Sequence, residues 1–181
     1  MPDTVFFHED YYKQIELVPE QNYFKAIIDI ENLPSKDENK YGFPNAIVRD
    51  EHLIKLGDLK ISFNQFYDLL SPIAINYFSK VTTGYNNNIQ TKENTVAFGF
   101  ERLGIFVSFE AEFVTNIWLC LSQLFAQTQN CQKILSALNI LGTTYKLALI
   151  DWDEEIIIRL SNYKSSEEYL MDTFGFMIPD K

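Results

Sequence analysis

The fold class is decided by one stretch of the sequence, Thr95-Val96-Ala97-Phe98-Gly99-Phe100-Glu101-Arg102-Leu103-Gly104-Ile105-Phe106-Val107-Ser108-Phe109. Its two runs, 95–101 and 104–109, are rich in the β-branched and aromatic residues that favour strands. The link Glu101-Arg102-Leu103-Gly104 joins them, so the two runs are predicted to form a β-hairpin. Hairpins of this kind, rather than a strict β-α-β alternation, predict a mostly antiparallel sheet.

The segment that follows the hairpin is predicted to be a helix. Its apolar residues recur at helical spacing: Phe113, Val114, Ile117, Trp118, Leu121, Leu124 and Phe125. Glu110 and Glu112 would lie favourably near the positive end of this helix. A strand over 116–121 is the competing interpretation, because the local β-propensity is high.

The C-terminal part of the chain predicts two more helices and two more strands. Helical spacing predicts a helix over 129–141, with Gly142 as the residue that ends it. Strands are predicted at 145–150 and 156–160, on either side of an acidic stretch. A last helix begins near Ser165 and ends near Gly175.

The N-terminal half is less regular. Strands are predicted over 4–7 and 12–18, the second ending at Pro19. The period then changes to that of a helix, which Pro34 stops. The remaining predictions are a solvated loop at 35–40, short strands at 46–49 and 60–62, helices at 62–70 and 72–81, and a polar turn region at 82–88.

These elements predict an α+β fold, with a mostly antiparallel sheet and helices packed against it. A chain of 181 residues fits one domain, 1–181. The polar turn region divides this domain into sub-halves at 1–85 and 90–181. With 46% hydrophobic residues the chain has ample material for a core, so disorder is not expected.

The net charge of −10 limits the classes of partner. Direct binding to nucleic acid or to an anionic membrane is disfavoured, because both demand a basic surface. An acidic protein suits a basic protein partner, which it attracts over a distance. Solubility alone is an equally simple reason for the acidity. The acidic residues are spread along the chain, with a net charge of −5 in 1–94 and −5 in 95–181.

Cysteine usage and the N-terminal sequence predict a cytoplasmic protein. Cys120 and Cys131 lie in apolar, helical-looking surroundings and are expected to be small core residues rather than a disulfide. With only two cysteines and two histidines, no metal site is expected, and the sequence has no cofactor motif. The N-terminal Met1-Pro2-Asp3-Thr4 has no signal-peptide pattern, and no apolar run is long enough to span a membrane.

The acidic stretch Asp151-Trp152-Asp153-Glu154-Glu155 is the first candidate site. Four carboxylates in a hairpin turn are expected to point into water and repel one another. They could dock a basic partner, with Trp152 as an anchor, because tryptophan is favoured at binding hot spots. A plain solvated turn and a cation site are the alternatives. The cation site is disfavoured, because the stretch lacks the glycine of a calcium loop.

The second candidate site is the aromatic and acidic segment at the N-terminus. Phe6, Phe7, Tyr11 and Tyr12 surround His8-Glu9-Asp10. In an extended strand His8 and Asp10 would share a face and Glu9 would point away. Partner contact through Glu9, Asp10, Tyr11 and Tyr12 is one interpretation, and a general base at His8 is another. His52 is expected to be a lone surface histidine.

Two segments resemble a known class of small bacterial proteins. The stretches 6–19 and 98–106 are similar to those of immunity proteins encoded beside polymorphic or contact-dependent toxins. The two stretches cover 23 of the 181 residues. The resemblance implies tight one-to-one inhibition of a toxin domain, commonly a nuclease, and it transfers no functional residue.

Three functions therefore remain open from the sequence. The first is a non-enzymatic binding protein of the immunity type, which occludes a basic active site. The second is a small hydrolase or transferase that uses His8 with Glu9 or Asp10. The third is a structural or adaptor domain. Nucleophile motifs and phosphate-binding glycine loops are absent from the sequence, which favours the first.

Overall fold

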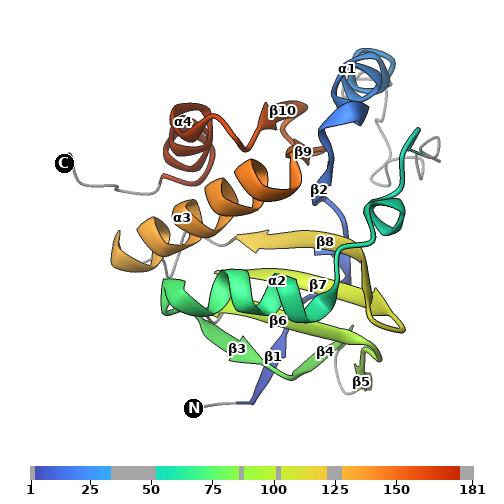
Figure 1. Cartoon of the computed structure of the whole chain (residues 1–181), viewed down its shortest axis with the longest axis vertical. Coiled ribbons are helices and arrows are strands. Elements are labelled where there is room, and N and C mark those ends of the chain that lie inside the picture. The colour runs from blue at the N-terminus through green and yellow to red at the C-terminus, as the bar shows by residue number, and fades with distance from the viewer. Residues whose placement is uncertain (1–2, 34–51, 86–87, 101–102, 122–127, 176–181) are drawn as a thin grey trace.

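A computed structural model describes residues 3–33, 52–85, 88–100, 103–121 and 128–175 (Figure 1). A seven-stranded sheet has the order β10-β9-β2-β8-β7-β6-β3, and a smaller sheet has the order β1-β4-β5. The strands are β1 (Thr4–Phe6), β2 (Ile15–Pro19), β3 (Asn76–Phe78), β4 (Lys80–Tyr85), β5 (Asn88–Thr91), β6 (Thr95–Phe100), β7 (Leu103–Glu110), β8 (Phe113–Leu121), β9 (Leu147–Asp151) and β10 (Ile156–Arg159). The predicted α+β class is confirmed.

The hairpin predicted at 95–109 forms the β6–β7 pair. Its register runs from Thr95 opposite Ser108 to Phe100 opposite Leu103. All pairs of the large sheet are antiparallel, and β1 with β4 is the one parallel pair among the described strands.

The predicted helix over 110–125 is wrong, because Phe113–Leu121 forms strand β8. β8 lies between β7 and β2, and Trp118 stacks on Phe106 of β7 at 5.5 Å between ring centroids. Core residues cover both faces of this strand, so its apolar residues need not alternate with polar ones. The competing prediction of a strand over 116–121 is the correct one.

Strand β2, near the N-terminus, lies between two strands from the C-terminal half of the chain. It pairs with β9 on one side, from Ile15 opposite Asp151 to Pro19 opposite Leu147, and with β8 on the other. The predicted end at Pro19 is confirmed. The predicted start at residue 12 is wrong, because Glu9–Tyr11 form a 3₁₀ turn and Lys13 has a left-handed backbone, with φ of 58°.

The region 71–91 differs most from its prediction. The helix expected at 72–81 stops after a 3₁₀ turn, Ser71–Ile73, where Ala74 takes a left-handed conformation with φ of 57°. Strands β3, β4 and β5 then replace the rest of that helix and the polar turn. Phe78 and Val81 are buried against Trp118, and this tertiary packing overrides the local helical spacing. The loop at 35–40 and the strand at 46–49 lie outside the described residues.

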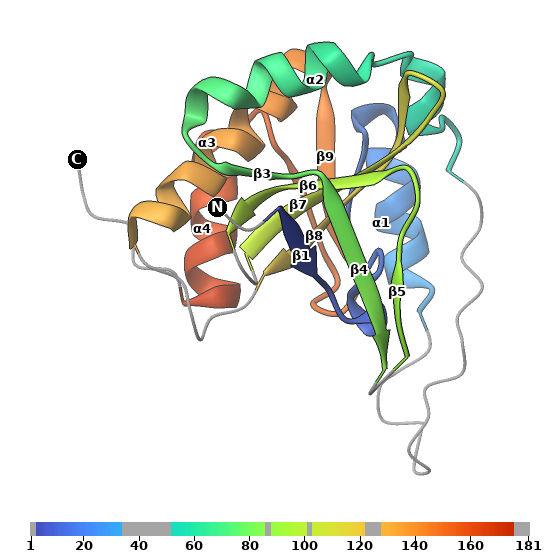
Figure 2. The ribbon, with the colours of Figure 1, turned by 90° about the horizontal axis from the view of Figure 1, so that it is seen from below.

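In the described part of the chain, four helices cover the sheet: α1 (Tyr23–Glu31), α2 (Phe63–Leu70), α3 (Thr128–Tyr145) and α4 (Tyr163–Phe174). Helices α2, α3 and α4 share one buried core with the first face of the large sheet. On the second face, α1 packs near β9 and β2, whereas the small sheet packs over β6, β7 and β8 (Figure 2). Cys120 and Cys131 are buried as predicted, although Cys120 lies on a strand.

Gly142 does not end α3, which continues to Tyr145. Instead the backbone of Gly142 lies directly against Leu160. A Cβ atom at position 142 would come within 2.3 Å of the carbonyl carbon and the Cβ of Leu160. Glycine is therefore needed here because the turn that follows β10 passes close to the helix.

We expect Gly142→Ala to lower the free energy of unfolding by about 1–3 kcal/mol, the usual cost of overpacking a core. Without the close contact, alanine would stabilise the helix more than glycine does. The sign of the change in unfolding free energy therefore tests the contact. Urea unfolding measures the change. The matched control is Gly57→Ala, where the nearest atom to the new Cβ is 3.7 Å away. A neutral or stabilising Gly142→Ala would contradict the packing.

Candidate functional site

The pairing of β2 with β9 brings the two predicted acidic segments to the same end of the sheet. Ile15 lies opposite Asp151, and the amide of Trp152 donates to the carbonyl of Gln14 at 3.0 Å. The segments 9–12 and 151–155, which are far apart in the sequence, therefore lie close together. This convergence could not be read from either segment alone.

Asp151 does not point into water as predicted. Only 1% of its surface is exposed. Its Oδ1 accepts hydrogen bonds from the amides of Asp153 and Glu154, both at 3.1 Å, and its Oδ2 accepts from the hydroxyl of Tyr169 at 2.6 Å. Burial and the neighbouring Asp151 carboxylate raise the pKa of Tyr169 well above its usual value. Asp151 therefore shapes the turn and ties it to α4.

Trp152 is also turned inward, so the expectation that it anchors a partner is not supported by its position. Its side chain is 6% exposed and packs in the core formed with Val18, Ala26, Ala148 and Ile150. Its Nε1 donates to Oε1 of Glu16 at 2.9 Å. The indole thus fixes the turn after β9 onto β2.

The remaining predicted acids are exposed. Glu9, Asp10, Asp153, Glu154 and Glu155 all lie at the surface. Tyr11, beside them, is 51% exposed. We call these six residues the acidic end. A hollow of about 390 Å³ lies within it, lined by Tyr11 from one segment and Asp151, Asp153 and Glu154 from the other, with Phe174 of α4.

His8 has a different geometry from the one predicted. The segment is not extended at this point, because His8 caps the 3₁₀ turn Glu9–Tyr11. Its Nδ1 lies 3.1 Å from Oδ2 of Asp10 and accepts from the Asp10 amide at 3.5 Å. His8 does not line this hollow. Tyr12 was also predicted to contact a partner, together with Glu9, Asp10 and Tyr11. It packs edge-on against Trp118, and the Lys92 ammonium lies 4.1 Å from the centroid of its ring.

His52 is not a lone histidine, because it is paired with a carboxylate that the sequence analysis did not single out. Its Nε2 lies 3.3 Å from Oε1 of Glu16, which is 6% exposed. Burial opposes ionisation of Glu16, but the hydrogen bonds from His52 and Trp152 and the charges of His52 and Lys13 outweigh it. The pKa of Glu16 is therefore below its usual value. Strand alternation places Glu16 on the face opposite Ile15 and Leu17 but does not show that this face is covered.

A cleft opens beside this pair, where β2 and β8 separate. Leu17 is the last residue of β2 opposite β8, and Pro19, two residues on, has no N–H to extend the pairing. On β8 the register shifts so that Asn116 faces Ser108 and Val114 faces Phe109. Thr115 is thus the extra residue of a β-bulge, a feature that bends a strand.

Beyond the bulge β8 has a new neighbour. The amide of Val114 donates to the carbonyl of Ile61 at 2.9 Å, and Ser62 and Phe113 form an isolated bridge. We call the space between the separated strands the fork cleft, and its volume is about 750 Å³. Glu16, Pro19 and Ile117 line it from the sheet, and His52 and the 3₁₀ helix η4 (Leu56–Leu59) line it from the other side.

The described residues contain no group of three or more histidine, cysteine or acidic side chains that could hold a metal ion. None of the helices in the described part of the chain is long and apolar enough to cross a bilayer. Comparison with protein-family models, with curated proteins and with solved structures gave no match. The chemistry of the acidic end and of the fork cleft therefore rests on their own geometry.

We expect Tyr169→Phe to destabilise the protein by about 1–3 kcal/mol, because it leaves a buried carboxylate oxygen of Asp151 without its donor. Urea unfolding measures the loss. Tyr67→Phe is the matched control, since Tyr67 is partly exposed on α2 and makes ring contacts that phenylalanine keeps. Equal effects of the two substitutions would show that the Asp151 contact is not a stabilising one.

Because the pKa of Glu16 is lowered in the folded protein, we expect part of the stability of the protein to be lost at acidic pH. Because the unfolded chain binds this proton more tightly, the contribution of Glu16 is present above the ordinary glutamate pKa of 4.5 and is lost as the pH falls through the folded value. Glu16→Gln should therefore be less stable than the wild type near neutral pH, and the difference should shrink below pH 4.5. Unfolding free energies across this range measure it. Glu31→Gln, which removes the same charge at an exposed position, is the matched control.

Proposed function

We propose that this protein is a non-enzymatic binding protein that docks a basic protein partner at its acidic end. The observation that carries the proposal is the convergence of the segments 9–12 and 151–155 through the β2–β9 pairing. Two short stretches contribute five exposed carboxylates and one exposed tyrosine to one end of the sheet. Charges of one sign gathered in one region raise the rate at which an oppositely charged partner associates.

The hollow at the acidic end offers a place for side chains of that partner. Its walls combine carboxylates, Asp153 and Glu154, with the rings of Tyr11 and Phe174. An arginine or lysine side chain suits such a site, because its aliphatic stem packs on rings while its charged group meets the carboxylates. Tyrosine is also among the residues that carry binding energy at interfaces.

The turn that presents these acids is rigidly supported. Asp151 accepts hydrogen bonds from two amides of the turn and from the hydroxyl of Tyr169, and Trp152 donates a hydrogen bond to Glu16. A loop held in this way loses little conformational freedom on binding, which favours tight association. Preorganisation of this kind supports a binding role for the turn.

The resemblance to immunity proteins supplies the class of partner in this proposal. The partner would be a basic toxin domain, such as a nuclease, whose cleft binds a negatively charged substrate. Occupying that cleft with the acidic end would exclude the substrate. The acidic end would then imitate the charge of the substrate without being chemically altered.

The test is a set of four substitutions at the acidic end, Glu9→Gln, Asp10→Asn, Asp153→Asn and Glu154→Gln. The candidate partner tested is the product of the adjacent gene, produced together with this chain. We expect affinity to fall by at least about a hundredfold, mainly at low salt, because four charge contacts are removed. Surface plasmon resonance at two salt concentrations measures it, and growth rescue in the producing cells reports inhibition.

The control removes the same charge elsewhere, with Glu31→Gln, Asp68→Asn, Glu93→Gln and Glu112→Gln, all at exposed positions outside the acidic end. Affinity and rescue should be nearly unchanged in this variant. If both sets weaken binding equally, net charge rather than the acidic end is responsible. If the wild-type chain neither binds nor neutralises the neighbouring product, the proposal fails.

A further inference from the structure

The fork cleft has the size and the walls of a small-molecule site. Its volume of about 750 Å³ lies within the usual range for ligand pockets, about 300–1,000 Å³. Apolar residues from both sides line it: Leu17, Pro19, Leu56, Phe113 and Ile117. The cleft exists because the strands of a sheet separate at Pro19 and at the Thr115 bulge, and bulges are often found beside functional sites.

The polar groups of the cleft are unequal in what they can offer a ligand. Two of its three acids already accept hydrogen bonds within the fold. Glu16 accepts from Trp152 and is paired with His52, and Asp58 accepts from the amide of Lys55 at 2.9 Å. The third acid, Glu110, is exposed at the end of β7.

The cleft also contains ammonium groups that can donate hydrogen bonds. Lys13, Lys55 and Lys60 line the cleft in a chain whose net charge is −10. The ammonium of Lys60 lies 5.2 Å from the ring centroid of Phe113. A cation over a ring is held in place but can still donate its N–H groups to another molecule. A ligand that complements these groups therefore needs acceptor atoms and a negative charge.

The backbone at the rim supports the same assignment. Lys13 and Lys60 both have left-handed backbones, with φ of 58° and 51°. Residues other than glycine rarely adopt this conformation, and such strain is often found at functional sites. Both lysines are thus held beside the cleft in unfavourable conformations.

We propose that the fork cleft binds a small organic anion, a molecule with a carboxylate or phosphate group on an apolar body. Lys60 contacts the anionic group, with Lys13 and Lys55 adding positive charge around it. The apolar body packs on Phe113 and on the apolar wall from β2 and β8. The site is separate from the acidic end and does not depend on the partner proposed there.

The experiment is a calorimetric titration of the full chain with phenyl phosphate, benzoate and benzylamine. The first two probes distinguish a phosphate from a carboxylate, and the third carries the opposite charge on a similar ring. We expect at least one anion to bind with a dissociation constant of about 1 mM or tighter, and benzylamine not to bind. Amide shifts of Leu56, Phe113 and Ile117 on titration should place the anion in the cleft.

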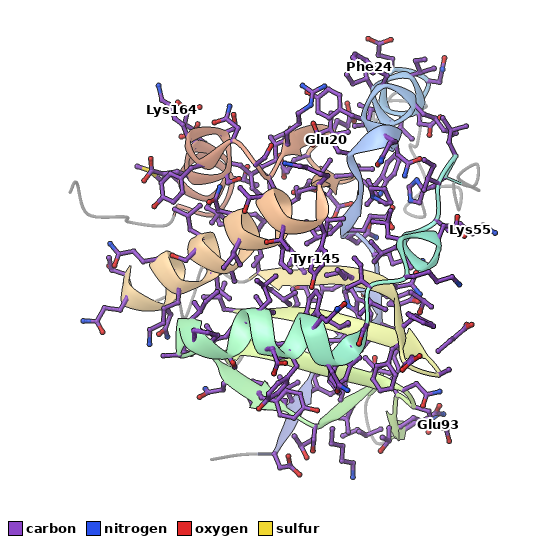
Figure 3. The ribbon with its side chains drawn as sticks, viewed as in Figure 1. Glu20, Phe24, Lys55, Glu93, Tyr145 and Lys164 are labelled. Carbon is purple, nitrogen blue, oxygen red and sulfur yellow. The ribbon has the colours of Figure 1, made fainter. Side chains whose placement is uncertain are left out.

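Lys60→Gln should weaken anion binding by about tenfold, the effect of losing one charged hydrogen bond. Lys164→Gln is the control, because Lys164 extends from α4 far from Lys55 of the cleft (Figure 3) and pairs with Glu168. The acidic-end variants should keep anion binding, and Lys60→Gln should keep partner binding, so the two proposals fail separately.

Three results would overturn the site. One is no saturable binding of either anion up to about 10 mM. Another is preferential binding of benzylamine. The third is equal weakening by Lys60→Gln and Lys164→Gln, which would show that the anion responds only to total charge.

Discussion

The insertion of β2 between β8 and β9 is the constraint on which the rest of the structure depends. Ile15 and Leu17 enter the core shared with α3, whereas Glu16 and Val18 face the other side of the sheet. A slip of one residue would exchange these faces and place the Glu16 carboxylate in the larger apolar core. The hydrogen bond from Trp152 to Glu16 can form in only one register of β2 against β9. This polar contact therefore specifies how the central strand is aligned with its neighbour.

The hairpin at 95–109 could be predicted because its two strands are neighbours in the sequence. The helix predicted at 110–125 failed for the opposite reason. Residues 113, 114, 117, 118 and 121 satisfy helical spacing, but they also satisfy a strand covered on both faces. The strand that decides between these possibilities, β2, comes from the beginning of the chain. Local pattern cannot include a partner that is about 100 residues away.

In the candidate site, too, the features set by neighbouring residues could be predicted and those set by distant residues could not. The sequence identifies both acidic segments, and five of their carboxylates are exposed as expected. It does not reveal that Asp151 and Trp152 turn inward, because their partners, Tyr169 and Glu16, lie outside the turn. Nor does it reveal the pair of Glu16 and His52. An acid between apolar neighbours in a strand normally predicts a solvated face, and here tertiary packing covers that face.

The two proposed sites lie along the same strand. Gln14 and Ile15 line the hollow at the acidic end, whereas Lys13 and the residues from Glu16 to Pro19 line the fork cleft. Glu16 is connected to both sites, because Trp152, which donates to it, supports the acidic turn, and His52, which pairs with it, lines the cleft. A change in the bonding of Glu16 would therefore alter the support of both sites together. If occupation of the cleft and binding at the acidic end influence each other, this carboxylate is the physical connection, and linkage requires the influence to be equal in both directions.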